Sequence, residues 1–321
     1  MLQEKGHIGY IDFLKGLAIV SVILLHALPK NVLVGIGAIL HIWQAVPLFV
    51  FISFVLIYLK LERKSLQDYY SKQSWIKLFK RIIFPFILME GCILTLLLLK
   101  DDTKQVASFF QNLRIGRGAY YFYIYLQIWL LAPLAFFCMR YNQKWGTVIL
   151  LFVSISGNVI IKGFAPMVES CIVVRYIFIA VVAYEWLNNH ESRWWRYFLP
   201  IISVIYWLLM DQYDFNPWIP NTGGWAGQQF PAYFYLFFFV NLMIYIYTKC
   251  PAYLCKLLSW CGKNSWEIYL VQMAFFLFPF DKLMPFGNSS IHLMAYCIVS
   301  LLLCIIPVYI YLKVKKSFQI Q

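Results

Sequence analysis

Ten apolar segments, separated by short polar stretches, dominate this sequence and constrain its fold more than any motif does. A helix of about 20 apolar residues crosses the roughly 30 Å hydrocarbon core of a bilayer. The composition agrees, because 62% of the residues are hydrophobic and 13% are charged, whereas soluble domains average about 45–50% and about 25%. We therefore expect an all-α, polytopic membrane protein that forms one domain over residues 1–321.

The distribution of basic residues sets the expected orientation of these helices. The spans, of which the seventh and ninth are short, are residues 10–28, 42–60, 82–99, 120–139, 146–162, 169–188, 197–210, 231–248, 265–280 and 291–312. About two thirds of the 27 Lys and Arg residues fall on the side that holds both termini, and cytoplasmic loops carry such an excess. We therefore expect the N and C termini in the cytoplasm. The net charge of +13 then reflects topology and attraction to membrane lipid, and no nucleic-acid partner is expected because no basic patch lies on a soluble module.

The first span, Tyr10 to His26, carries three ionisable side chains: Asp12, Lys15 and His26. At about 100° per residue, Lys15 and His26 lie within about 20° of each other around the helix axis, with Asp12 about 60° to one side. The three residues therefore share one face. The rise from Lys15 to His26 is roughly 16 Å, so Lys15 would lie at one membrane surface and His26 more than halfway across.

A histidine at that depth is costly unless it faces protein or a watery cavity, which makes His26 a candidate functional residue. Its unperturbed pKa of about 6.5 suits it to proton transfer near neutral pH. The same position also fits a histidine near the far interface, or one that is hydrogen-bonded inside a helix bundle. The spacing alone favours neither explanation.

A basic cluster ends the longest expected cytoplasmic loop, residues 60–81. Lys77, Lys80 and Arg81 lie there, just before Pro85. Such a cluster would hold the phosphate groups of a cofactor at the membrane surface. The excess of basic residues that fixes membrane topology explains the same cluster without any ligand.

The expected outer loop, residues 211–230, combines aromatic and polar side chains. Asp211, Trp218 and Trp225 are its candidate ligand-binding residues, because aromatic faces beside carboxylates and amides suit a sugar. A loop anchored by tryptophans at the membrane interface would have the same composition.

Several other polar residues invite structural explanations. Glu90 and Arg175 are charges inside expected spans, and Arg175 would pair with a carboxylate from another helix, of which Glu90 is one candidate. Asn264 with Glu267 three residues later forms a capping-box pattern at the start of the ninth span. The eight cysteines show no metal-ligand spacing, so no metal is expected.

The first span also resembles the opening helix of the acyltransferase 3 family of integral-membrane acyltransferases. That helix begins with Asp-x-x-Lys/Arg-Gly and pairs its basic residue with a later histidine, here Lys15 and His26. Further matching blocks follow in order at residues 41–53 (HIWQAVPLFVFIS), 77–86, 120–133 and 262–272, so the resemblance covers the whole chain. Two positions depart from the pattern: Phe54 replaces the usual Gly, and Gln272 replaces the expected His.

The resemblance implies an enzyme in the cell (inner) membrane of a bacterium. Such enzymes move an acetyl or other acyl group from cytoplasmic acyl-coenzyme A to a hydroxyl of a sugar in an envelope or exported polysaccharide. His26, Lys15 and Asp12 would be the catalytic residues, with His26 as a base or as a transient acyl carrier and Asp12 orienting or balancing Lys15. The cationic residues near the anionic head of acetyl-CoA would be Lys15, Lys77, Lys80 and Arg81.

A second function remains open at this stage. In a ten-span small-molecule transporter, Lys15, His26, Glu90 and Arg175 would line the path, because intramembrane charges suit both classes of protein. A third interpretation is an inactive homologue that acts as a partner in glycan assembly, which the intact Lys15–His26 face disfavours.

Overall fold

The computed structural model describes residues 9–100, 118–164, 171–188, 195–213, 230–277 and 290–318, with a few isolated positions between 101 and 117. Within these ranges the protein is helical and contains no strand, as expected for an all-α membrane protein. The chain divides into two compact units, Met1–Ala45 with Asn241–Gln321 and Val46–Val240. The single domain expected over the whole chain stays a prediction.

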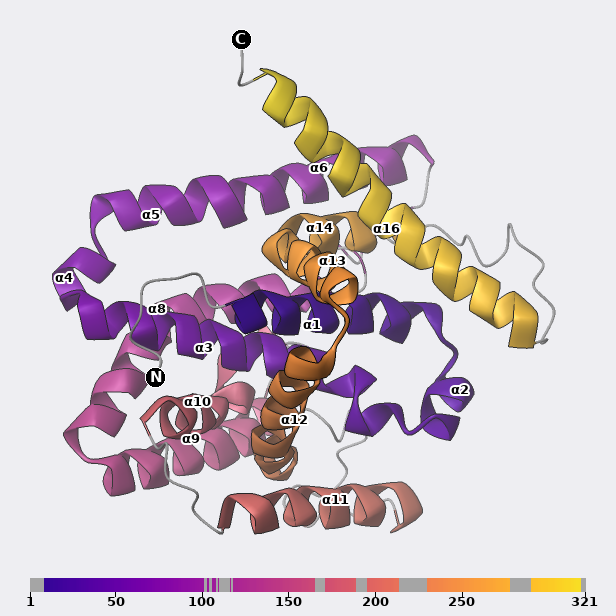
Figure 1. Cartoon of the computed structure of the whole chain (residues 1–321). Helices are drawn as coiled ribbons and strands as arrows, with labels where there is room; N and C mark the ends of the chain where they lie inside the picture. The colour runs from indigo at the N-terminus through magenta and orange to yellow at the C-terminus, as the bar shows by residue number, and fades with distance from the viewer. Residues whose placement is uncertain are drawn as a thin grey trace. The chain divides into compact units, whose positions relative to one another are not determined.

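The first unit is built around its N-terminal helix. Helix α1 packs mainly on α13 and also contacts α14 and α16, and α14 packs on α16 (Figure 1). The elements are α1 (Gly9–Ala27), α2 (Lys30–Gly35), η1 (Ala38–Leu40), η2 (Ile42–Gln44), α13 (Ala252–Lys263), α14 (Ser265–Phe275) and α16 (Ser290–Phe318). Helix α12 (Tyr235–Lys249) begins in the second unit and ends in the first.

The second unit contains a helical hairpin, α8 with α9, against which α10 also packs. The remaining elements include one continuous helical run, α5 through η3 into α6, in which η3 is a π-helical turn. The elements are α3 (Ala45–Arg63), α4 (Leu66–Tyr69), α5 (Lys72–Leu78), η3 (Phe79–Ile83), α6 (Phe84–Leu99), α8 (Tyr120–Tyr141), α9 (Gln143–Phe164), η5 (Val173–Tyr176), α10 (Ile179–Asn188), α11 (Trp195–Tyr213) and η7 (Phe230–Phe234).

Polar caps and prolines fix where several helices begin. The Ser65 hydroxyl accepts a hydrogen bond from the Asp68 backbone N–H at the start of α4, and the Asn142 side chain does the same for the Trp145 N–H at the start of α9. These side chains satisfy N–H groups that have no partner within the helix. Pro251 immediately precedes α13, where its missing N–H costs nothing.

Seven helical stretches among the described residues are long and apolar enough to cross a membrane. They are Gly9–Ala27, Ala38–Arg63, Leu66–Leu99, Tyr120–Tyr141, Gln143–Ile161, Phe230–Lys249 and Ile291–Ser317, and each overlaps one of the ten expected spans. The other three expected spans, 169–188, 197–210 and 265–280, contain helices whose apolar stretches are shorter, such as Phe198–Met210 within α11. The protein is therefore a multi-pass membrane protein, while the count of ten and the cytoplasmic termini stay predictions.

Candidate active site

Helices α1 and α13 of the first unit touch backbone to backbone through two glycines, Gly16 and Gly262. A Cβ atom at Gly16 would lie 1.9 Å from the carbonyl oxygen of Leu258, and one at Gly262 would lie 1.7 Å from that of Asp12. No side chain fits at either distance. Small residues allow membrane helices to approach this closely. We call this contact the glycine crossing.

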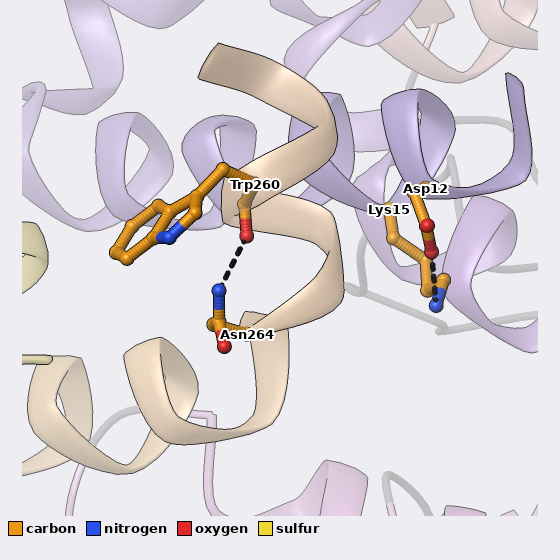
Figure 2. A network of polar contacts seen from close by, with 4 residues as sticks. All are labelled: Asp12, Lys15, Trp260 and Asn264. Carbon is orange, nitrogen blue, oxygen red and sulfur yellow. Dashed lines mark hydrogen bonds and ion pairs between the residues drawn. The ribbon is translucent and has the colours of Figure 1, made fainter. Parts of the chain in front are cut away.

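The glycine crossing joins two stretches that are far apart in the sequence, the first helix and the block that begins at Gly262. Figure 2 shows Asp12 and Lys15 on α1, with Trp260 and Asn264 at the end of the facing helix, α13. Sequence reasoning found both stretches but missed that their glycines meet. The available signal was that one glycine directly follows Lys15 and that the other opens the late block.

Asp12 and Lys15 form an ion pair on the first turns of α1. The Lys15 Nζ lies 2.9 Å from Asp12 Oδ1, which confirms that the two residues share a face. The Asp12 side chain is 1% exposed and that of Lys15 is 22% exposed. A carboxylate this buried needs a charged partner, so Asp12 holds the Lys15 ammonium in place. The partial exposure of Lys15 leaves part of that cation accessible to a ligand.

His26 lies in the last turn of α1, at the opposite end of the helix from Lys15. Its side chain is partly buried, and its ring centroid lies 5.6 Å from that of Phe276, just beyond α14. The chain after α1 folds back over this end of the helix, where Leu25 and Leu33 share a buried apolar cluster with Ala38 and Ile42. The turn that carries His26 is therefore packed within protein.

The expected capping box at Asn264 and Glu267 is wrong. Asn264 does precede α14, but its side chain makes no capping hydrogen bond to that helix. Its Nδ2 instead donates to the Trp260 carbonyl oxygen at 2.8 Å (Figure 2). Asn264 also ends α13, and the last carbonyls of a helix lack partners within it. The Asn264 amide therefore satisfies a carbonyl at the end of α13 and not an N–H at the start of α14.

Lys77, Lys80 and Arg81 lie in the second unit and are exposed. Lys77 is in the last turn of α5, while Lys80 and Arg81 lie in the π-helical turn η3. Pro85 follows, and because it has no N–H it cannot hydrogen-bond to the carbonyl of Arg81, four residues earlier. Single π-helical turns are frequent at functional sites. These cations and Lys15 belong to different units.

The other sequence candidates belong to the second unit or lie outside the described residues. Asp211 lies in the last turn of α11, whereas Trp218 and Trp225 lie outside the described residues. Glu90 in α6 and Arg175 in η5 are both buried, and their pairing stays a prediction. Among the described residues, no three His, Cys, Asp or Glu side chains gather in a way that could hold a metal ion.

Comparison with known proteins gives one match. The model of the acyltransferase 3 family, which is described as an acyltransferase domain, matches residues 8–309. No curated protein and no solved structure matches the chain. The matched range includes α1, α13, α14 and most of α16, and therefore both sides of the glycine crossing. This multi-pass membrane protein therefore belongs to the acyltransferase 3 family of membrane acyltransferases.

Proposed function

We propose that the protein is an O-acetyltransferase that moves an acetyl group from cytoplasmic acetyl-CoA to a sugar hydroxyl. The acceptor would be part of an envelope or exported polysaccharide, as a glycan or a lipid-linked sugar, and the enzyme would act in the inner cell membrane. The observation that carries the proposal is the polar face of α1, on which Asp12 fixes Lys15 at one end and His26 lies at the other.

That face matches the shape and charge of the donor. Coenzyme A has an anionic phosphoadenosine head and a long arm that ends in a thioester. Lys15, still partly exposed, would contact the head or the adjoining pyrophosphate. The helix rises roughly 16 Å between Lys15 and His26, a distance that the extended arm spans. In the second unit, the exposed cations Lys77, Lys80 and Arg81 are separate candidates for binding the phosphate groups of the donor.

His26 supplies the chemistry in one of two ways. As a general base, its imidazole accepts the proton of the sugar hydroxyl while the hydroxyl oxygen attacks the thioester carbonyl, and the coenzyme A thiolate leaves and takes up that proton. As a nucleophile, the imidazole attacks the thioester carbonyl, and the coenzyme A thiolate leaves and takes up the imidazole proton. The sugar hydroxyl then attacks the acetyl-imidazole, the acetyl group passes to the sugar oxygen, and the hydroxyl proton returns to the freed imidazole. Asp211, Trp218 and Trp225 would contact the sugar.

The test is acceptor-stimulated release of free thiol from acetyl-CoA by purified protein in nanodiscs. Wild-type protein should release thiol when a crude glycan extract is added, and His26→Ala should release none beyond background. His292→Ala is the matched control, because this histidine lies exposed on α16 and outside the proposed site. Thiol release by His26→Ala at the wild-type rate would contradict the proposed role, and a wild-type protein that binds no acetyl-CoA would contradict the proposed function.

A further inference from the structure

Helix α8 contains Pro133, and a side chain from α4 meets the backbone carbonyl that this proline leaves without a helical partner. Proline has no N–H and therefore leaves the carbonyl four residues earlier, that of Trp129, without its helical partner. The Tyr69 hydroxyl donates to the Trp129 carbonyl at 2.9 Å, and the Tyr70 hydroxyl donates to the Leu130 carbonyl at 2.6 Å. Two hydrogen bonds thus fix the end of α4 against the turn of α8 that precedes Pro133.

The same residues build a stack of aromatic rings that ends at an exposed indole. The buried Tyr69 ring stacks on Trp129, with centroids 5.3 Å apart. Trp75 of α5 contacts Trp129 edge-on at 4.5 Å. Trp75 nevertheless remains 43% exposed. Its ring therefore packs against the buried Trp129 and still offers surface to a ligand.

Three lysines gather around this stack. The Lys60 Nζ lies 4.3 Å from the centroid of the Tyr69 ring. Lys64 and Lys77 lie near enough to Lys60 for their positive charges to repel it. Among the described residues, no carboxylate forms an ion pair with any of the three. Like charges that are brought together without a counter-ion repel one another, so an anion would be bound favourably there.

We propose that Lys60, Lys64, Trp75 and Lys77, here called the aromatic–cationic cluster, bind the 3′-phosphoadenosine head of the acyl donor. The proposal rests on the proposed function and assigns this site to one part of the donor. The adenine ring stacks on Trp75, as bases stack on aromatic side chains in nucleic-acid complexes. The lysines pair with the phosphate groups. Tyr69 and Tyr70 are positioning residues, because they act through Trp129 and Leu130.

The cluster favours a nucleotide over a lipid headgroup. Both ligands carry phosphate, but only the nucleotide has a planar base that can stack on the exposed indole of Trp75. Adenosine 3′,5′-bisphosphate should therefore bind to full-length protein in phosphatidylcholine nanodiscs, and pyrophosphate should bind more weakly. Equal affinity for the two, or loss of bisphosphate binding when phosphatidylglycerol is added, would overturn the assignment in favour of lipid.

Substitutions test the individual members of the cluster. By calorimetry, Trp75→Leu should weaken the bisphosphate affinity about tenfold or more, the range measured for base stacking. Lys60→Gln should weaken it by a similar factor. Matched controls are Trp145→Leu and Lys144→Gln, an exposed neighbouring pair at the start of α9, and both should bind as wild type does. Affinities of Trp75→Leu and Lys60→Gln within twofold of wild type would overturn the proposal.

A measurement on unaltered protein guards against variants that misfold. Photoreactive 8-azidoadenosine 3′,5′-bisphosphate should label the peptide that contains Trp75, and unlabelled acetyl-CoA should compete. Labelling confined to other peptides would overturn the proposed subsite while leaving the acetyltransferase proposal intact. A wild-type protein that binds neither the bisphosphate nor acetyl-CoA would overturn both.

Discussion

The glycine crossing of the first unit lies beside Lys15, and the aromatic–cationic cluster of the second unit contains Lys60, but the two are built in opposite ways. At the crossing, two residues without side chains let the α1 and α13 backbones meet beside Asp12 and Lys15. At the cluster, Pro133 has no N–H, so the Trp129 carbonyl lacks its partner within α8. The Tyr69 hydroxyl donates a hydrogen bond to that carbonyl instead. Added atoms should therefore damage the crossing, whereas removed atoms should damage the cluster.

The largest effect is expected from adding a single methyl group at the crossing. Gly262→Ala places a Cβ within van der Waals overlap of the Asp12 carbonyl, and overpacking costs about 1–3 kcal/mol even where side chains can adjust. Backbone atoms cannot move aside as easily. We expect a lower thermal midpoint and acetyl transfer near background.

The matched control for that change is Gly35→Ala, because nothing lies within 4 Å of a Cβ placed at Gly35. It should leave both the thermal midpoint and the activity unchanged. Wild-type activity in Gly262→Ala would show that the two helices do not meet as described.

The next largest effect is expected at Lys15. Lys15→Gln removes the cation that Asp12 holds, and a charge-assisted hydrogen bond contributes about 1.5–3 kcal/mol. The KM for acetyl-CoA should therefore rise roughly tenfold or more, with a smaller change in kcat. Lys15→Arg keeps the charge and should recover part of the affinity. A donor affinity that is unchanged in Lys15→Gln would remove Lys15 from the donor site.

A smaller effect is expected from removing one oxygen atom at the cluster. Tyr69→Phe leaves the ring stack in place but deletes the hydrogen bond to the Trp129 carbonyl, which is worth about 1 kcal/mol. The thermal midpoint should fall slightly, and the Kd for adenosine 3′,5′-bisphosphate should rise severalfold. Tyr141→Phe, at the exposed end of α8, is the control and should change neither. If the Kd of Tyr69→Phe equals that of wild type, Tyr69 has no positioning role.

The smallest effect concerns a thiol that reports on the crossing. Burial raises the pKa of the Cys261 thiol to about 11, and only the thiolate reacts rapidly with maleimides. Labelling of Cys261 should therefore be slow near pH 7 and should accelerate as the pH approaches that pKa. In Gly262→Ala, labelling should be faster at every pH. Rapid labelling of the wild-type protein near pH 7 would contradict close packing of α13.

The sequence predicted the helical membrane fold and the shared face of Asp12 and Lys15, because hydropathy and helical periodicity are local properties. The sequence could not predict that Gly16 and Gly262 lie at the same helix contact, because the packing of α1 on α13 is a tertiary interaction between distant segments. The capping box failed because Asn264 belongs to two helices at once. The role of Tyr69 could not be predicted either, because its hydroxyl bonds to the Trp129 carbonyl, which Pro133 leaves without a helical partner 60 residues further along the chain.

The most direct test of the central claim, that α1 carries an acetyl-transfer site, is the transfer of radiolabel from acetyl-CoA to a glycan acceptor. Label should appear in the acceptor as an alkali-labile ester with wild-type protein and with His292→Ala, and should be absent with His26→Ala. Ester formation by His26→Ala at the wild-type rate, or labelled acetyl-CoA left intact by well-folded wild-type protein with its acceptor present, would contradict the account.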